Sequence, residues 1–219
     1  MFKRLITLFK LGRKLAKSDA LTIVSKFNKP PLLVTVIFKL LSFSFTKKDM
    51  SFDNLSEGEK LSNSLASMGT TFIKLGQFLA TRPDIIGDGL SKELESLQDK
   101  LPPFSQSKAK EMIRNDLGDE IYNSIINISE PVAAASIAQV HKAQIDDNGV
   151  IKDVAIKILR PDIKKIFNEE VDALMLFAFI IESLIKKTKR LKLVEVVFLL
   201  KEITSLEMDL RFEAAAANE

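Results

Sequence analysis

The sequence contains no cysteine and only one histidine, His141, among its 219 residues. The absence of cysteine excludes disulfide frameworks and thiol nucleophiles, and a single histidine leaves almost no donor set for a zinc site. A metal ion, if the protein uses one, would therefore be a hard cation held by carboxylates. A lone histidine on a predicted strand is more typical of a structural residue than of a general base, so we assign His141 no catalytic role.

Acidic residues are scarce in one part of the chain. Residues 1–48 hold 11 Lys and Arg but only one acid, Asp19, which leaves 21 basic against 28 acidic residues in the remainder. Lys and Arg alternate with Leu, Ile and Phe over residues 2–17 as in a basic amphipathic helix, which favours an anionic membrane surface as a partner. A frayed terminus or a helix packed on its own domain would give the same pattern. Nucleic acid is not expected as a partner.

The sequence has no apolar run long enough to predict a transmembrane helix. The most apolar stretch, residues 31–45, has 15 residues, whereas roughly 20 are needed to span a bilayer. It predicts an interfacial or buried helix. No small-residue cleavage site follows it, which disfavours export.

Hydrophobic periodicity predicts a helical region before residue 125. The capping-box pattern of residues 56–59 opens a helix that is expected to run to Thr81, before Arg82 and Pro83. Further helices are predicted at 89–100 and from about Ser105 onward.

The pattern then changes to strands and returns to helix. The turn sequence of residues 146–149 predicts a β-hairpin that ends with a strand at 151–159. A helix is predicted from residue 162 to Lys187 and another from Leu191 to the terminus, which gives an α+β fold. The first of these should turn five apolar residues inward: Val171, Leu174, Phe177, Ile181 and Leu184.

The candidate chemistry begins at Lys157, the end of the sequence Val-Ala-Ile-Lys on the second hairpin strand. Strand alternation places Lys157 on the same face as Ala155 and away from Ile156. A kinase lysine in this context contacts nucleotide phosphates and pairs with a carboxylate from a following helix. Taken alone, a lysine that ends an apolar strand is also a common edge-strand feature. Upstream, the alanine-rich segment 131–141 has small side chains that permit close backbone approach to phosphate.

The sequence AAASIAQVH, followed by VAIK, resembles the UbiB/AarF family of atypical kinases. Two further family motifs occur in the family's order, a KxGQ motif at 74–77 and an ExD motif at 207–209, so the resemblance covers about residues 55–219. It implies nucleotide-binding residues Ala133, Ala134, Ala135, Ser136 and Lys157, an ion-pair partner Glu213 on helix C, KxGQ residues Lys74, Gly76 and Gln77, and ExD carboxylates Glu207 and Asp209.

The resemblance leaves some of these roles open. Either Glu207 or Glu213 could pair with Lys157, and on one continuous helix residue 207 would lie about 160° from residue 209, so the carboxylates would not all face one ligand. In the family the KxGQ helix is thought to lie across the protein-substrate pocket, where it would restrain protein phosphorylation. Without the other motifs, Lys74 and Gln77 would be read as a solvated helix face and Gly76 as a close helix crossing.

The resemblance also implies an architecture and a function. We expect a membrane-facing segment at 1–48, a helical extension with the KxGQ motif at 49–126, and a kinase-like N-lobe with a small antiparallel sheet and helix C at 127–219. The C-lobe is expected to be absent, so catalytic and metal-binding residues are expected in no part of this chain, and Mg²⁺ would bind only if a C-lobe were supplied.

The implied protein is a truncated bacterial atypical kinase or ATPase that binds ATP or ADP and supports ubiquinone biosynthesis. Its expected partners are an adenine nucleotide, an anionic membrane, a separately encoded C-lobe and other ubiquinone-biosynthesis proteins. We expect it to be cytoplasmic and peripheral on the inner membrane. A non-catalytic membrane-associated scaffold or an inactive gene remnant are the alternatives.

Overall fold

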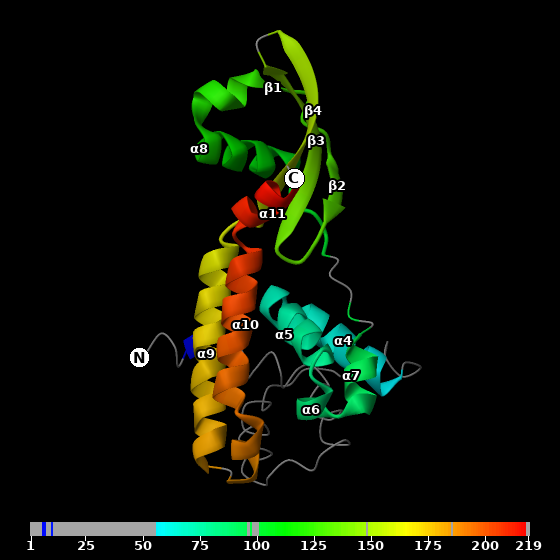
Figure 1. Cartoon of the computed structure of the whole chain (residues 1–219), viewed down its shortest axis with the longest axis vertical. Coiled ribbons are helices and arrows are strands. Elements are labelled where there is room, and N and C mark those ends of the chain that lie inside the picture. The colour runs from blue at the N-terminus through cyan, green and yellow to red at the C-terminus, as the bar shows by residue number, and fades with distance from the viewer. Residues whose placement is uncertain are drawn as a thin grey trace. The chain divides into compact units, whose positions relative to one another are not determined.

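The computed structural model describes residues 6, 7, 10, 56–95, 97, 101–147, 149–184 and 186–217. The chain forms two compact units. The first comprises residues 1–98 and 164–207, and the second comprises residues 99–163 and 208–219. Among the described residues, Figure 1 shows helices in the first unit and the sheet in the second, so the predicted α+β class is confirmed.

Four helices of the first unit come from residues 57–94: α4 (Glu57–Met68), α5 (Thr70–Ala80), α6 (Pro83–Ile86) and α7 (Asp88–Leu94). The predicted capping box opens α4, because Glu59 N–H donates to Ser56 Oγ at 3.2 Å and Ser56 N–H donates to Glu59 at 2.8 Å. The prediction of a single helix that runs to Thr81 is wrong. Gly69 (φ 105°, ψ −176°) separates α4 from α5, a conformation almost restricted to glycine.

Gly69 and Gly89 provide a matched pair for testing this break. An added Cβ meets no atom within 4 Å at either position, but only Gly69 has a positive φ. We expect Gly69→Ala to lower the free energy of unfolding by about 1–3 kcal/mol, because alanine strains this backbone. Gly89→Ala, inside α7, should raise it by about 0.5–1 kcal/mol, because alanine favours helix. Urea denaturation of both variants checks this, and equal effects would contradict it.

The rest of the first unit is a helical hairpin made of α9 (Ile163–Leu184), the 3-10 helix η2 (Lys186–Leu191) and α10 (Leu193–Glu207). Asp172 on α9 and Lys201 on α10 form an ion pair at 3.4 Å. Among the predicted inward residues of α9, Val171 and Leu174 are buried, but Leu184 is 61% exposed. The prediction for Leu184 is wrong, because this residue ends α9 at the tip of the hairpin.

The last helix of the chain is also interrupted. The sequence predicts one helix from Leu191 to the terminus, whereas α10 ends at Glu207 and α11 begins at Leu210 (Leu210–Ala217). Asp209 caps α11, since its carboxylate accepts the Arg211 N–H at 3.3 Å. Because of this break, residues 207, 209 and 213 do not share one helix, and the angular relation predicted between 207 and 209 does not apply.

The second unit is built around β3 (Ala138–Asp147), which pairs antiparallel with β1 (Ile125–Ile126), β2 (Pro131–Ala134) and β4 (Val150–Leu159). The predicted hairpin is β3–β4, in continuous register from Ala138 opposite Leu159 to Asp147 opposite Val150. The turn includes Gly149 at φ 86°, and the N–H of Gly149 donates to the Asp146 carboxylate at 2.6 Å. A two-residue connection with positive φ suits the twist of a hairpin.

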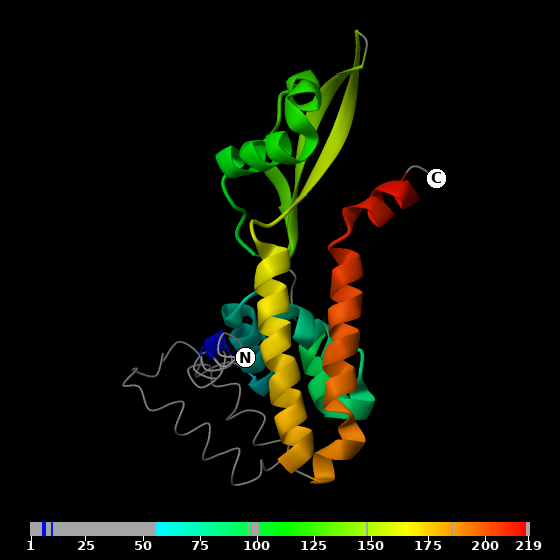
Figure 2. The same cartoon turned by 90° about the vertical axis from the view of Figure 1, so that its left-hand side faces the viewer.

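One helix packs against this sheet, and a second contacts its opposite face through an ion pair. Ala109 and Ile113 of α8 (Gln106–Ser124) form a buried cluster with Ile158 of β4. Strand alternation turns the neighbouring Lys157 to the other face, where it contacts α11. Figure 2 shows α8 and α11 on either side of the strands. The predicted start of α8 is confirmed, because Ser105 caps it by accepting the Lys108 N–H at 3.3 Å.

Several predictions concern residues outside this description. The expected membrane-facing segment 1–48 lies outside the described residues except for positions 6, 7 and 10. Among the helices that the structure describes, none combines the length and the apolarity needed to cross a bilayer. The two compact units are defined by contacts between residues. The predicted domains 1–48, 49–126 and 127–219 are defined by motifs and charge, so the boundaries of these domains stay predictions.

Candidate functional site

The sheet face that carries Lys157 is lined by small side chains. The strand register aligns Ala133 on β2 with Val140 on β3, and Val140 with Lys157 on β4. Ala155 and Lys157 are exposed on this face. The next residue, Ile158, is buried on the opposite face, toward α8. The row from Ala133 to Lys157 therefore forms an accessible surface with one cation at its edge.

Lys157 forms a two-point ion pair with Glu213 of α11. Its Nζ lies 2.8 Å from Oε1 and 2.5 Å from Oε2 of Glu213. The side chains are 35% and 60% exposed, so solvent screens the pair and it contributes only about 0–1 kcal/mol to stability. The pair does, however, hold the ammonium group at a defined place on the open face. Glu213 also lies in the first turn of α11, where the helix dipole favours a negative charge.

The alanine-rich segment forms the end of β2 and the turn into β3. The Ala135 N–H donates to the Ala138 carbonyl at 2.8 Å, which closes the turn. Ala133 is exposed and Ala134 and Ala135 are half-buried, so all three can be approached from solvent. Ser136 is 0% exposed. Of the predicted nucleotide-binding residues, Ser136 alone is inaccessible to a ligand in this conformation.

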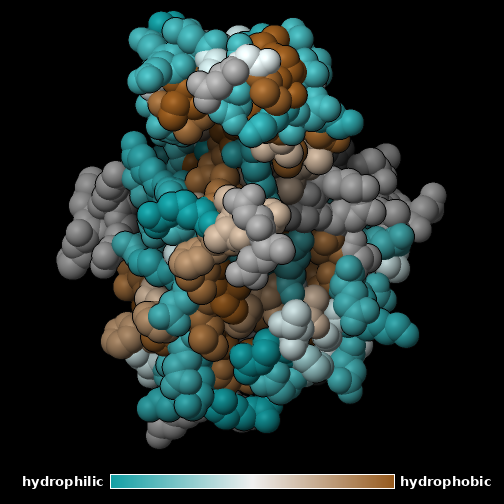
Figure 3. Space-filling model, turned by 45° about the horizontal axis from the view of Figure 1, so that its top comes forward, coloured by the Kyte–Doolittle hydropathy of each residue, from teal (hydrophilic) through white to brown (hydrophobic). Residues whose placement is uncertain are grey.

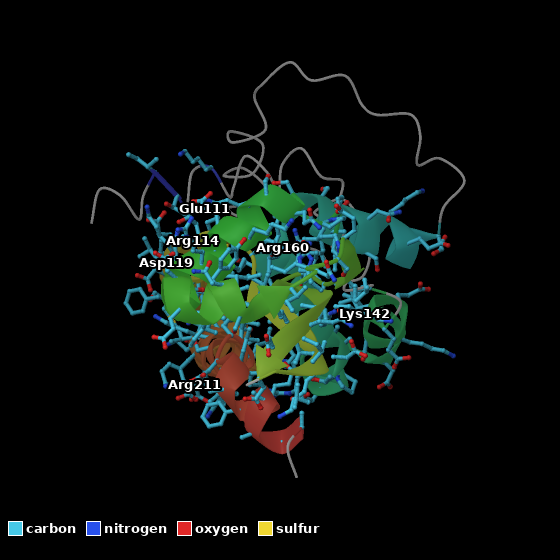
Figure 4. All side chains as sticks on the ribbon, turned by 90° about the horizontal axis from the view of Figure 1, so that it is seen from above. Glu111, Arg114, Asp119, Lys142, Arg160 and Arg211 are labelled. Atoms are coloured by element: carbon cyan, nitrogen blue, oxygen red, sulfur yellow. The ribbon has the colours of Figure 1, made fainter. Side chains whose placement is uncertain are left out.

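Arg160, which directly follows β4 and carries no recognisable motif in the sequence, fixes this turn. Its guanidinium group donates to the Ala135 carbonyl at 2.8 and 2.9 Å, to the Pro102 carbonyl at 3.0 Å and to the Leu101 carbonyl at 3.2 Å. The Arg160 N–H donates to the Ile137 carbonyl at 2.8 Å. Arg160, labelled in Figure 4, thus ties the alanine turn to the segment that precedes α8.

Gln139 and His141 form a buried network on the other side of β3. The Gln139 amide exchanges two hydrogen bonds with the backbone of Phe104, at 3.0 and 3.2 Å. His141 Nδ1 lies 2.8 Å from the Ser129 carbonyl and its Nε2 lies 2.9 Å from the Gln139 amide nitrogen. Because a carbonyl only accepts, Nδ1 carries the proton and Nε2 accepts from Gln139. Both ring nitrogens of His141 are thereby used inside the fold.

The carboxylates near the end of the chain contact three different cations. Glu213 contacts Lys157, whereas Asp209 forms a two-point pair with Arg211 at 2.7 and 2.5 Å. This hydrogen-bonded pairing and the charge of Asp209 raise the pKa of the Arg211 guanidinium above its usual value. In the first unit, Glu207 pairs with Lys74. Each of the three acids thus contacts a different cation.

The KxGQ residues lie on α5. Lys74 Nζ is 2.8 Å from Glu207 Oε2, and the Lys74 side chain is only 11% exposed. Gly76 is buried, and a Cβ at this position would lie 2.5 Å from Leu97 Cδ2 and 2.9 Å from Leu65 Cδ1. The glycine therefore permits close packing of α5. Gln77 is half-buried on the same helix.

Comparison with known proteins identifies the family. Residues 96–219 match the ABC1 atypical kinase-like domain. The chain belongs to the ABC1 atypical kinase-like family. It is 37% identical over 166 residues to a probable protein kinase UbiB of Marinobacter nauticus, covering 75% of this chain and 30% of that protein. It is 34% identical over 189 residues to the probable protein kinase UbiB of Shewanella pealeana, a match that covers 86% of this chain and 34% of that protein.

The chain spans about a third of the length of these curated relatives. No solved structure matches it. The family predicted from the motifs is thus confirmed at the level of the ABC1 domain, while the roles of individual site residues stay predictions. In the part of the chain that the structure describes, no group of three or more Asp, Glu or His side chains could hold a metal ion.

Proposed function

We propose that this ABC1-family chain is the nucleotide-binding lobe of a UbiB-type atypical kinase or ATPase that supports ubiquinone biosynthesis. In this proposal residues 127–219 correspond to a kinase N-lobe, with α11 as helix C. The ion pair between Lys157 and Glu213 is the observation that carries it. The pair is too exposed to serve stability and lies beside a turn of small residues, a combination that suits a phosphate contact.

In this proposal, different residues of the chain have different roles in nucleotide binding. The Lys157 ammonium would neutralise negative charge on the phosphates of ATP or ADP, and Glu213 would keep that ammonium in place. The backbone of Ala133, Ala134 and Ala135 would approach the phosphates, because their side chains leave room. Arg160 would hold the turn in place by donating hydrogen bonds to the Ala135 carbonyl.

Phosphoryl transfer would require more than this lobe. It needs a catalytic-loop Asp, an Asn and a metal-binding Asp, which in kinases belong to the C-lobe. We propose that a C-lobe, on a separate chain or in a longer form of this one, supplies these groups and the Mg²⁺ they hold. The Lys74–Glu207 pair would hold the KxGQ helix in place in the first unit.

We also propose that the protein is peripheral on the cytoplasmic face of the inner membrane. The support comes from the sequence, where residues 1–48 hold 11 basic residues and one acid. A basic, apolar helix of this kind binds anionic lipid surfaces.

The nucleotide proposal is tested by binding of a fluorescent ATP analogue to the full chain, alone and with the C-lobe of a UbiB relative. We expect Lys157→Ala to weaken binding about tenfold, because one charge-assisted phosphate contact is lost. Glu213→Gln should weaken it less, because it only loosens the lysine. An accompanying thermal-shift measurement should show a smaller nucleotide-induced shift for Lys157→Ala.

Lys152→Ala is the matched control for this experiment. Lys152 lies on the same strand as Lys157 and also forms an exposed ion pair, with Asp147 at 2.5 Å. It lies toward the hairpin turn, so its loss should leave nucleotide affinity unchanged. An equal loss in both variants, or no binding with or without a C-lobe, would refute the proposal and favour a scaffold without nucleotide.

A further inference from the structure

The tip of the α9–α10 hairpin carries a concentrated positive charge. Residues 186–192 contain five basic residues, and no acid occurs from residue 183 to residue 194. The basic residues are Lys186, Lys187, Lys189, Arg190 and Lys192. The nucleotide proposal uses none of them.

This tip has a defined structure. The carboxylate of Glu182, the nearest acid before the tip, accepts the Val194 N–H at 3.1 Å. The Thr188 hydroxyl donates to the Ile181 carbonyl at 3.3 Å. Lys192 has a φ of 48°, the left-handed region that asparagine and glycine adopt more readily than lysine. Glu182 is thus engaged within the hairpin, and the basic residues of 189–192 are exposed at its surface.

A cavity of about 220 Å³ opens beside the tip. Its charged lining consists of Arg82, Asp84, Arg190, Lys192 and Glu195. Arg82 pairs with Asp84 at 2.7 Å and Lys192 pairs with Glu195 at 2.9 Å, whereas Arg190 has no ion-pair partner within the described residues. The lining therefore has a net positive charge, and Arg190 is the cation left for an external anion.

Apolar side chains flank these cations at the same end of the hairpin. Leu184 is 61% exposed, Phe198 is 51% exposed, and Leu199, which also lines the cavity, is 40% exposed. Figure 3 shows brown, hydrophobic side chains in patches among hydrophilic ones on one face of the molecule. Exposed apolar groups next to a cation cluster are typical of a surface that meets lipid.

We propose that the tip of the α9–α10 hairpin docks on an anionic phospholipid membrane. Arg190, Lys189 and Lys192 would contact headgroup phosphates, and Leu184, Phe198 and Leu199 would enter the boundary between headgroups and acyl chains. A nucleic-acid strand would use the cations but not the aliphatic side chains, so lipid explains more of the surface. This contact is separate from that proposed for residues 1–48 and does not depend on nucleotide binding.

Tryptophan fluorescence can report on this tip alone, because the chain contains no tryptophan. We expect the emission of a Phe198→Trp variant of the full chain to shift to shorter wavelength with vesicles of phosphatidylglycerol and phosphatidylcholine, and not with phosphatidylcholine alone. Brominated acyl chains should quench it. A Phe212→Trp variant is the control, since Phe212 is 63% exposed on α11, and its emission should not change.

Charge removal provides the second arm. In the Phe198→Trp background, Lys189→Gln, Arg190→Gln and Lys192→Asn together should weaken vesicle binding about 100-fold, because each cation near an anionic surface contributes about fivefold. Asparagine at 192 tolerates the positive φ. The matched control removes three exposed cations from elsewhere in the described chain, through Lys142→Gln, Lys164→Gln and Lys165→Gln.

The outcomes separate the possibilities. A tip-specific blue shift that is lost in the tip variant and kept in the control supports the proposal. Equal losses in both triple variants would show general charge attraction and overturn it. A shift produced by inorganic phosphate or by single-stranded RNA in place of vesicles would also overturn it, as would unshifted emission from vesicle-bound Phe198→Trp protein.

Discussion

Replacing Arg160 with methionine is expected to lower the free energy of unfolding of the second unit by about 3–5 kcal/mol. The guanidinium group makes four hydrogen bonds to three backbone carbonyls, and losing a partly buried charged donor leaves its acceptors unsatisfied, at about 1–3 kcal/mol each. Methionine keeps most of the side-chain volume, so lost packing adds little. Arg160→Lys should be intermediate, because an ammonium group does not reproduce the planar fork.

The measurement is simple in this chain because Tyr122 is its only tyrosine and it has no tryptophan. Tyr122 packs against the α8 cluster of the second unit, so its fluorescence during urea denaturation reports the unfolding of that unit. Arg211→Met is the control, since Arg211 pairs with Asp209 but its side chain is 89% exposed. It should leave the midpoint nearly unchanged. If Arg160→Met were no more destabilising than this control, the anchoring role of Arg160 would be wrong.

A faster local opening of the alanine turn should accompany the loss of stability. The Ala135 N–H is bonded to the Ala138 carbonyl, and the Ala135 carbonyl is held by Arg160. Without the guanidinium the turn is attached on one side only, so exchange of the Ala135 amide proton should accelerate more than exchange of amides in β4. If the nucleotide proposal holds, the same variant should bind nucleotide more weakly.

Local signals explain the parts of the fold that the sequence predicts well. The hairpin β3–β4 follows from a short turn with Gly149 between two alternating strands, and the caps at Ser56 and Ser105 depend on residues within three positions. Each of these features involves neighbours in the chain. The backbone geometry of such turns and caps depends on a few consecutive residues, so a short stretch of sequence is enough to predict them.

The errors occur where periodicity continues across a break. Leu65, Met68 and Phe72 are all buried at helical spacing although Gly69 lies between α4 and α5. An apolar stripe therefore predicted one helix, and only the glycine indicated otherwise. The break between Glu207 and Leu210 was missed for a related reason, because Asp209 acts as a helix cap but occurs within a motif that was placed on one helix.

Arg160 and Gln139 could not have been found from spacing. Arg160 donates to carbonyls 58 and 59 residues earlier in the chain, and Gln139 pairs with the backbone of Phe104, 35 residues away. Backbone carbonyls are present at every residue, so no pattern of side chains marks them as acceptors. The sequence did indicate the residues of the Lys157–Glu213 pair, but it left the choice between Glu207 and Glu213 open.

Because Lys74 is much more buried than Glu207, we expect mutations of the two residues of this ion pair to change the free energy of unfolding by different amounts. Lys74 is 11% exposed and Glu207 is 41% exposed. Removing the glutamate charge takes a carboxylate partner away from an ammonium group in a site with little water, whereas removing the lysine leaves a carboxylate that water can reach. We expect Glu207→Gln to lower the free energy of unfolding by about 2–3 kcal/mol and Lys74→Met by less than about 1 kcal/mol.

The double variant decides whether charge or packing is responsible. In Lys74→Met/Glu207→Gln no charge remains to be buried, so its stability should approach that of Lys74→Met, with a coupling of about 1–2 kcal/mol between the sites. Far-ultraviolet circular dichroism during urea denaturation follows the helices of the first unit. Asp172→Asn is the control, because its pair with Lys201 is longer, at 3.4 Å, and the two side chains are more evenly exposed, at 38% for Lys201 and 34% for Asp172. If the double variant were as unstable as Glu207→Gln, the carboxylate would act through its shape and hydrogen bonding, and burial of the Lys74 charge would not be the cause.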